Sequence, residues 1–380
     1  MENPFKYGGV VRGSYFADRK DEIKELRREM LNQNRVFLVS PRRYGKTCLL
    51  LNLVDELRSK KIACAYIDLN ACPDIKSLAS MITTLSSREL ETNRDKLFKI
   101  LSGLQRLRLK VSTGPDGSIV AGVELAVDEK EALEALLEGM RHTEELAAKK
   151  KKKLVIIIDE FSDIQKYNGA SVEKALRSEI QRQSEVGYIF SGSEQSVMLS
   201  MVREKSRAFY KLGRILELGP IEQTAYIRFI RGWLKKGKFA FEGQHLTRVL
   251  EIGNHVPYNI QRLCSVMWDQ ALESRRISPE LIEKLPVVIA KQDSPHYEMQ
   301  WRAASQPQKL LLIALSRDQS VKPFSRDFQL SHGIGPSSSI KASLESLVKK
   351  GILFKRLDGS YRFVDGFMPY WIDQIRRNLY

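Results

Sequence analysis

Residues 36–48 read Val36-Phe37-Leu38-Val39-Ser40-Pro41-Arg42-Arg43-Tyr44-Gly45-Lys46-Thr47-Cys48. This stretch joins an apolar strand pattern to a short loop that ends in Gly-Lys-Thr, and a helical pattern follows at once. Bound phosphate needs inward-pointing backbone N–H groups, and a helix N-terminus supplies them together with a favourable dipole. A phosphate-binding loop requires this strand–loop–helix context. We therefore predict nucleotide contacts from Ser40, Pro41, Arg42, Arg43, Tyr44, Gly45, Lys46, Thr47 and Cys48.

The end of this loop predicts which ligand it binds. Lys46 is placed to reach the β- and γ-phosphates, and Thr47 is placed to put its hydroxyl on Mg²⁺. Ser40 stands where such loops usually begin with glycine, and a small residue at the strand end can take that place. The expected cofactors are ATP or ADP together with Mg²⁺.

A second apolar run, Leu154–Ile158, ends in the adjacent carboxylates of Asp159 and Glu160. Ligands of α/β proteins bind at the carboxyl ends of the strands. Asp159 is predicted to hold Mg²⁺, directly or through water, and Glu160 to orient and polarise the attacking water. Both side chains can reach one site because the strand ends at this point. With Lys46, the two carboxylates predict hydrolysis of ATP.

A third strand pattern, Gly187–Phe190, leads into Ser191-Gly192-Ser193. A strand lying between the two already described would deliver a hydroxyl close to the γ-phosphate. Ser193, or failing it Ser191, is predicted to help position the attacking water. A simple Gly/Ser turn is the alternative interpretation.

Alternating strand and helix patterns predict an α/β fold with a parallel sheet covered by helices on both faces. The expected strands are Val36–Val39, Ile62–Leu69, Leu154–Ile158, Gly187–Phe190 and Ile215–Leu218. Helical patterns include Lys46–Lys60 and Ser171–Ser184. Residues 106–126 predict an inserted β-hairpin around the turn residues Thr113–Gly117. Gly219-Pro220 then ends the core, so we predict an ATPase core over 1–220, a helical domain over 221–300 and a third domain over 301–380.

The composition limits the class of protein. The chain has 380 residues and a formal net charge of +16, which favours a polyanionic partner. No stretch approaches the ~18 apolar residues of a membrane span, and the N-terminus lacks the apolar run of a signal peptide, so we expect a cytoplasmic protein without membrane contact. The four cysteines form no CxxC pair, which indicates neither a disulfide framework nor a zinc site. The lysine run Lys149–Lys153 is interpreted as a solvated helix end, with a polyanion site as the alternative.

Together these segments resemble the archaeal-type ATPase family of the AAA+ and STAND grouping. The matching residues are Asn3-Pro4-Phe5, Phe16–Glu22, Pro41–Thr47, Ile158–Phe161, Ser191–Ser193 and Pro257–Gln261. The resemblance extends over nearly the whole chain. It implies a P-loop core, a helical lid over 221–300 and a C-terminal winged helix. It also implies ATP or ADP at the junction of core and lid, and assembly into a homo-oligomer.

Two features depart from the family's pattern. Gly253-Asn254 is followed by His255-Val256-Pro257 where AAA+ lids place a sensor arginine, which favours nucleotide contact by Pro257. Arg262 could substitute as the sensor, or could simply face solvent. Arg207 and Arg214 fall where the family carries an arginine that acts on a neighbouring subunit's nucleotide. We predict this role for Arg214, with a structural or surface role as the alternative.

The last domain has the layout of a winged helix. Helical patterns at Gln308–Ser316, Ser325–Ser331 and Ser337–Lys350 precede a hairpin that turns at Asp358-Gly359. The third helix of this fold can lie in the DNA major groove. Residues 301–380 carry 13 Lys and Arg against 6 Asp and Glu, a net of +7. We therefore predict DNA contacts from Ser338, Lys341, Lys349, Lys350, Lys355, Arg356 and Arg362.

The predicted function is ATP binding and hydrolysis, coupled to DNA binding or remodelling as in replication initiators or transposition regulators. Turnover is expected to be slow and stimulated by a partner. One alternative is a nucleotide-dependent signalling or assembly switch whose winged helix binds protein. Another is a nucleotide-binding scaffold with negligible turnover. Arg106, Arg108 and Lys110 of the inserted hairpin are a second predicted DNA contact.

Overall fold

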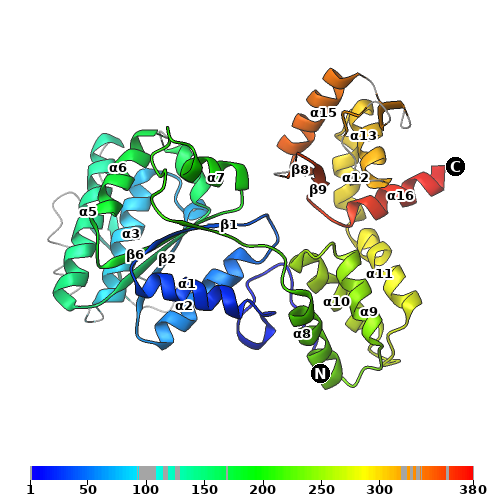
Figure 1. Cartoon of the computed structure of the whole chain (residues 1–380), viewed down its shortest axis with the longest axis horizontal. Coiled ribbons are helices and arrows are strands. Elements are labelled where there is room, and N and C mark those ends of the chain that lie inside the picture. Colours follow the sequence, from blue (N-terminus) through cyan, green and yellow to red (C-terminus); the bar gives the residue numbers. More distant parts are fainter. Residues whose placement is uncertain are drawn as a thin grey trace. The chain divides into compact units, whose positions relative to one another are not determined.

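The computed structural model describes residues 2–91, 93, 108–113, 119–124, 129–167, 170–317, 323–325, 328–330, 334, 336–356 and 359–379. The chain divides into two compact units (Figure 1). The core unit is Arg12–Gly219, and the C-terminal unit combines Pro220–Tyr380 with Met1–Val11. The sequence-based division placed this N-terminal segment with the core. It joins the other unit because Asn3 and Phe5 contact that unit's helices.

The core unit is built on a five-stranded parallel sheet with the strand order β2-β5-β6-β1-β7. These strands are β1 (Arg35–Val39), β2 (Ala63–Asp68), β5 (Leu154–Asp159), β6 (Val186–Gly192) and β7 (Arg214–Glu217). In the register, Val39 lies beside Gly192 and Asp68 lies beside Asp159. The five predicted strands are confirmed, and their carboxyl ends meet at one edge of the sheet.

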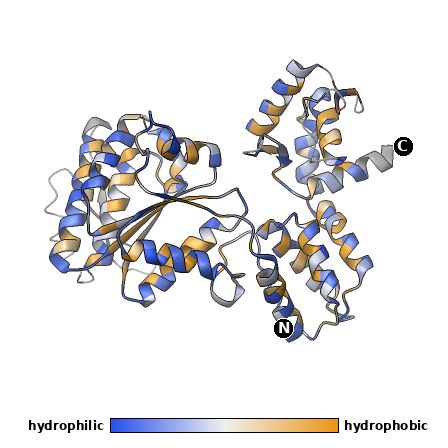
Figure 2. Cartoon of the chain, in the orientation of Figure 1, coloured by the Kyte–Doolittle hydropathy of each residue, from blue (hydrophilic) through white to orange (hydrophobic). Residues whose placement is uncertain are grey.

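Helices cover both faces of this sheet (Figure 1). They are α1 (Lys20–Leu31), α2 (Lys46–Ser59), α3 (Ile75–Leu90), α5 (Glu129–Lys150), α6 (Ala170–Arg182) and α7 (Gln195–Arg203). Successive strand residues enter opposite cores, as the period of two requires. In β5, Val155 and Ile157 pack with the α1–α2 layer, whereas Ile156 and Ile158 pack with α3 and the helices beside it. Figure 2 shows the apolar colour of the strands between these helices.

The predicted hairpin is present as an antiparallel pair, β3 (Arg108–Thr113) and β4 (Ile119–Glu124). Arg108 is paired with Glu124, and Thr113 with Ile119. Arg106 and the turn residues 114–118 lie outside the described residues, so the turn predicted there is not tested.

The C-terminal unit begins with four helices: α8 (Gln223–Lys236), α9 (Gly243–Ile252), α10 (Pro257–Gln270) and α11 (Pro279–Gln292). The N-terminal segment docks on them. Asn3 Nδ2 donates to the Ser265 carbonyl at 3.0 Å and to Asp269 at 2.9 Å. Phe5 is buried edge-on against the Trp268 ring.

The winged helix follows as α12 (Ser294–Arg302), α13 (Gln306–Arg317), α15 (Ser337–Lys349), β8 (Leu353–Lys355), β9 (Tyr361–Phe363) and α16 (Met368–Leu379). β8 and β9 form the antiparallel wing. Its core includes Leu344, Leu347 and Trp371. Of the predicted short helix Ser325–Ser331, residues 328–330 are helical and the rest is only partly described. Among the described residues, none of the helices combines the length and the apolar composition that a membrane span needs.

Candidate nucleotide-binding and catalytic site

The residues of the core unit predicted to bind phosphate, hold the metal and prepare the water meet at the carboxyl edge of the sheet. Lys46 and Thr47 open α2 directly after the loop that follows β1. Asp159 ends β5, and Ser191 lies near the end of β6, the strand between β1 and β5. Residues that lie far apart in the sequence are therefore brought to one place by strand order alone.

The loop from Ser40 to Gly45 turns the chain sharply into α2. Ser40 is fully buried and continues the sheet, because its N–H donates to the Gly192 carbonyl at 3.3 Å. Arg43 and Gly45 have positive φ, +71° and +83°. A β-carbon on Gly45 would meet no atom within 4 Å, so glycine is needed there for its backbone conformation and not for space. The first N–H groups of α2 face away from the helix, where anions bind.

Lys46 is the buried centre of the site. Its ammonium group donates to Asp159 Oδ1 and, at 3.0 Å, to Glu160 Oε1. The Lys46 side chain is 6% exposed and that of Asp159 is 2% exposed, so this ion pair is shielded from water. Arg42, earlier in the loop, lies in solvent and approaches Glu194 at 4.0 Å.

Asp159 accepts hydrogen bonds from several donors. Thr47 Oγ1 donates to Asp159 Oδ2 at 2.9 Å, and Ser191 Oγ donates to Asp159 Oδ1 at 2.9 Å. Burial alone would raise the pKa of the Asp159 carboxyl, but the Lys46 charge and the hydrogen bonds outweigh burial and lower that pKa. Asp159 is thus an anion at neutral pH, as a metal ligand must be.

Glu160 reaches the same site because the backbone turns at this residue. Its φ is +53°, a left-handed conformation that costs about 1–2 kcal/mol for a residue with a β-carbon. Ser193 then holds the carboxylate: the Ser193 hydroxyl and N–H donate to Glu160 Oε2 at 2.9 and 3.2 Å. The two serines considered from the sequence therefore have separate partners, Ser191 on Asp159 and Ser193 on Glu160.

Tyr66 is a site residue that the sequence did not reveal. It lies on β2, and its hydroxyl donates to Asp159 Oδ2 at 2.9 Å. Burial, and next the nearby Asp159 charge, raise the pKa of Tyr66, so it remains a donor. Tyr66 reaches the site because β2 pairs with β5, and no sequence motif predicts that pairing.

Arg19 is a second residue that the motif pattern did not single out. The side chain is 2% exposed, and its guanidinium donates to the Tyr44 carbonyl at 3.2 Å and to the Gly219 carbonyl at 2.7 Å. It also pairs with Glu22 at 2.7 Å. Arg19 therefore ties the phosphate-binding loop to the last residue of the core unit.

The donor set fits Mg²⁺. The Thr47 hydroxyl and the Asp159 carboxylate lie next to each other, and hard oxygen ligands of this kind suit the ion. Among the described residues, no group of three or more His, Cys, Asp or Glu could hold a metal by itself. Mg²⁺ commonly takes only one or two protein ligands and completes its shell with phosphate and water.

The two arginines considered for action on a neighbouring subunit both have partners within the chain. Arg214 begins β7, at the sheet edge opposite the phosphate-binding loop, and pairs with Glu25 and with Glu29 at 3.0 Å. Arg207 pairs with the buried Glu173 at 2.6 Å. Neither side chain belongs to this chain's own phosphate site, and action on a neighbour stays a prediction.

The two residues considered as nucleotide sensors of the lid lie in α10. Pro257 is buried at the first turn, and its carbonyl accepts from the Tyr226 hydroxyl at 3.1 Å. Arg262 does not face solvent, which corrects that interpretation: its side chain is 7% exposed and pairs with Asp293 at 2.8 Å. The rings of Tyr7 and Phe367 flank its guanidinium. Arg262 thus joins the helical lid to residues next to the winged helix.

The predicted DNA contacts divide into two kinds. Six of the seven are exposed: Ser338, Lys341, Lys349, Lys350, Lys355 and Arg356. Lys350 Nζ, however, donates to the Ala303 carbonyl at 2.8 Å and to Gln308 at 3.1 Å, which gives this lysine a structural contact. Arg362 is half-buried on β9.

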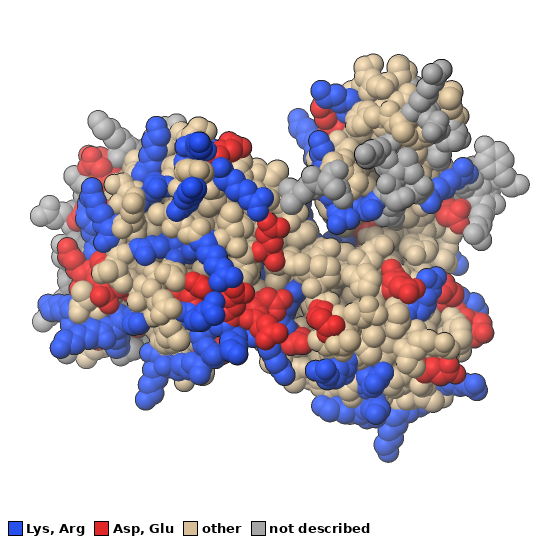
Figure 3. Space-filling view, in the orientation of Figure 1, with Lys and Arg blue, Asp and Glu red and all other residues tan. Residues whose placement is uncertain are grey.

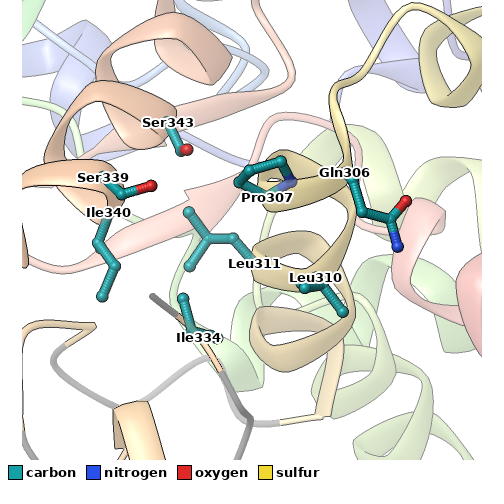
Figure 4. Close-up of a pocket in the computed structure, with 8 residues that line it drawn as sticks. All are labelled: Gln306, Pro307, Leu310, Leu311, Ile334, Ser339, Ile340 and Ser343. Carbon is teal, nitrogen blue, oxygen red and sulfur yellow. The ribbon is translucent and has the colours of Figure 1, made fainter. Parts of the chain in front are cut away.

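An apolar pocket of about 240 Å³ lies between α13 and α15 of the winged helix (Figure 4). Its lining residues are Gln306, Pro307, Leu310, Leu311, Ile334, Ser339, Ile340 and Ser343. None of them is charged, and the lining hydroxyls are those of Ser339 and Ser343. The pocket suits an apolar side chain and not a phosphate.

The loop, the paired carboxylates and the strand order define the class: this is a P-loop ATPase fold with a C-terminal winged helix. Residues 16–232 match the family described as an ATPase domain predominantly from Archaea. That match covers more than half of the chain, and the chain belongs to this family. Residues 295–374 match a probable winged helix domain.

Two solved structures share the fold over nearly the whole chain. The Walker-type ATPase PABY2304 of Pyrococcus abyssi is 15% identical and has a TM-score of 0.62, over 97% of this chain and 99% of its own. The ORC2 protein of Aeropyrum pernix, in ADPNP-ADP complexes, is 12% identical and has a TM-score of 0.56, over 99% of this chain and 98% of its own. At these identities the likeness shows the fold alone. No curated protein matches the chain.

Proposed function

We propose that the protein binds ATP with Mg²⁺ at the carboxyl edge of the core sheet, hydrolyses it, and couples nucleotide state to DNA binding by the winged helix. One observation carries the proposal: Lys46 contacts both Asp159 and Glu160 while Thr47 contacts Asp159. The four side chains that phosphoryl transfer to water would need here, those of Lys46, Thr47, Asp159 and Glu160, are therefore linked by hydrogen bonds.

The residues divide the chemistry among them. Lys46 and the first turn of α2 stabilise charge on the phosphates. Thr47 and Asp159 would hold Mg²⁺, and the ion would offset the negative charge of the phosphates. Glu160 orients the attacking water and accepts its proton, and Ser193 fixes the direction of that carboxylate. The ORC2 protein of A. pernix, which shares the fold, was solved with ADPNP and ADP, and this supports a nucleotide at the corresponding site.

The charge of the winged helix supports DNA as the partner. Lys341 is near the start of α15, and Lys355 and Arg356 are at the end of β8, all exposed. Phosphate contacts of this kind position a protein on a duplex and make its affinity depend on salt. Lys350 is left out of the proposed surface because its ammonium group is engaged within the chain.

A fluorescence-anisotropy titration of duplex DNA tests this coupling. The variant Lys341→Ala/Lys355→Ala/Arg356→Ala is expected to bind at least about tenfold more weakly at roughly 0.1 M salt. The matched control is Lys235→Ala/Lys236→Ala/Lys238→Ala, which removes three exposed positive charges from the lid. If both variants bind duplex DNA with the affinity of the wild type, the winged helix is not the DNA-binding surface.

A protein-coupled switch is the second candidate, and the apolar pocket between α13 and α15 favours it. On that proposal the winged helix receives an apolar side chain of a protein partner. The variant Leu311→Gln would be expected to abolish such binding if it remains folded, while leaving DNA affinity unchanged.

We also propose assembly into a homo-oligomer in which Arg214 or Arg207 acts on a neighbour's nucleotide. Such an arginine would contribute to hydrolysis only in the assembly. Mixing an Arg214→Ala chain with a Lys46→Ala chain tests this, because each would then lack a different half of a shared site. Hydrolysis by the mixture above that of either variant supports sharing, and the same experiment with Arg207→Ala separates the two arginines.

A further inference from the structure

A second concentration of positive charge lies on the core unit, at the amino ends of the strands. Two loops that are distant in sequence supply it. Lys60 and Lys61 lie between α2 and β2, and Lys149–Lys153 end α5 and lead into β5. Six of these lysines are exposed. Lys153 Nζ donates to the Leu31 carbonyl at 2.6 Å, and we call the other five the lysine edge: Lys60, Lys61, Lys149, Lys151 and Lys152.

The sheet register places the two loops side by side. β2 and β5 are parallel neighbours, and Ala63 pairs with Leu154. Lys61 and Lys152 each lie two residues before that pair. Neighbouring strands are about 4.8 Å apart, so the two loops form one surface and not two separate ones. Figure 3 shows lysine and arginine side chains gathered at the lower left of the core unit.

Three carboxylates near this surface are already engaged. Glu89 pairs with Arg58, and Glu91 pairs with Lys150. Glu144 accepts hydrogen bonds from the N–H groups of Ser184 and Glu185, at 2.7 and 3.0 Å.

The five lysines, by contrast, form no ion pair within the part of the chain that the structure describes. Glu145 is exposed one turn before Lys149 but does not pair with it. Like charges so close together repel one another, and a polyanion would remove that repulsion.

The composition of the surface indicates the kind of polyanion. Lysine is a flexible point charge, which suits phosphates whose positions vary from one sequence to the next. Neither loop exposes a large apolar side chain of the kind that anchors a protein in a membrane surface. We propose that the lysine edge binds the phosphate backbone of duplex DNA without reading its sequence.

The position separates this surface from the nucleotide site. Tyr66 and Asp159 lie near the carboxyl ends of the strands whose amino ends carry the lysine edge. A strand of this length spans about 17–20 Å, so DNA on the lysine edge leaves the nucleotide site accessible. The surface is therefore additional to the winged helix and does not depend on it.

The test uses the full chain, a labelled duplex and anisotropy titrations between about 50 and 200 mM salt. The variant changes all five residues of the lysine edge to Gln. The matched control changes five other exposed lysines of the core unit to Gln: Lys20, Lys24, Lys174, Lys205 and Lys211. Basal ATP hydrolysis of each variant, expected to be unchanged, reports whether it is folded.

The lysine-edge variant is expected to lose about tenfold or more in affinity and to reduce the slope of log affinity against log salt by about 2, with the control unchanged. Affinity and slope equal to the control would overturn the proposal. So would unchanged DNA binding with lost binding to a polyglutamate peptide or to phosphatidylserine vesicles. If the winged-helix variant still binds DNA and the lysine-edge variant does not, the lysine edge is the DNA-binding surface and the winged helix is not. If only the lysine-edge variant still binds DNA, the winged helix is the DNA-binding surface and the lysine-edge proposal is wrong.

Discussion

The hydroxyl of Thr47 lies 2.9 Å from the carboxylate of Asp159, although the two residues are on different elements and far apart in the chain. Thr47 begins α2 and Asp159 ends β5, two strands away from β1 in the sheet. This contact is what joins the phosphate-binding loop to the second carboxylate motif. It places both proposed Mg²⁺ ligands next to the buried Lys46.

Thr47→Ala should uncouple nucleotide binding from Mg²⁺. Removal of the hydroxyl leaves Asp159 as the one protein ligand, so Mg²⁺ should no longer raise ATP affinity and hydrolysis should fall about hundredfold. Titration of a fluorescent ATP analogue with and without Mg²⁺ measures the first effect. Thr47→Ser keeps the hydroxyl and is the control. Wild-type Mg²⁺ dependence in the alanine variant would show that Thr47 is not a metal ligand.

Glu160→Gln should bind ATP as tightly as the wild type but hydrolyse it about 10²–10⁴-fold more slowly, because the amide cannot accept the proton of water. A single-turnover assay with prebound ATP separates the two steps. Asp163→Asn is a useful control, since Asp163 lies one turn away and pairs with Lys166 on the surface. Undiminished turnover in the Gln variant would favour the scaffold interpretation with negligible catalysis.

The two serines of β6 should give different defects. Ser193→Ala frees one oxygen of Glu160 and should lower the hydrolysis rate about tenfold without changing Mg²⁺ dependence. Ser191→Ala removes a buried donor from Asp159 and should weaken nucleotide binding with Mg²⁺ instead. Measuring kcat and the Mg²⁺ titration for both variants distinguishes them. Identical defects in the two variants would contradict the separate pairings seen here.

Arg262 should be essential for the stability of the C-terminal unit. Arg262→Ala leaves the carboxylate of Asp293 without its partner, and the expected loss is about 3 kcal/mol of unfolding free energy by urea titration. Arg248→Ala, which breaks exposed pairs with Glu283 and Glu251, should cost less than about 1 kcal/mol. An equal loss of unfolding free energy in the two variants would show that the Arg262–Asp293 pair is not a buried ion pair that stabilises the C-terminal unit.

The same pair predicts a pH dependence. Burial alone would raise the pKa of Asp293, but the hydrogen bond and charge of Arg262 lower it below the ordinary value. A group whose pKa is lower in the folded state stabilises the fold above its unfolded pKa of about 3.9, and that contribution is lost as pH falls through the folded value. Asp293→Asn should therefore differ most from the wild type at neutral pH and least in acid.

Much of the site could be predicted because its motifs are local. Gly45-Lys46-Thr47 and Asp159-Glu160 each follow an apolar strand, and parallel strands bring their carboxyl ends together. Tyr66 and Arg19 could not be predicted in this way. Tyr66 depends on which strand neighbours β5, and Arg19 reaches the loop from a turn before α1, so only the tertiary fold assigns them.

The basic residues show a different limit of prediction. Composition alone does not separate Lys350, which is engaged within the chain, from Lys341, which faces solvent. Nor does it reveal that Lys61 and Lys152 belong to one surface, since that depends on the pairing of Ala63 with Leu154. The sequence shows how many charged residues there are, but not which residues lie next to each of them in the fold.

Steady-state ATP hydrolysis with and without duplex DNA, with Lys46→Ala as the blank, tests the central claim most directly. We predict Mg²⁺-dependent hydrolysis that is absent from the Lys46→Ala chain and rises when DNA is added. Hydrolysis that DNA leaves unchanged would contradict the proposed coupling of ATP turnover to DNA, and hydrolysis no faster than that of the Lys46→Ala chain would contradict turnover itself.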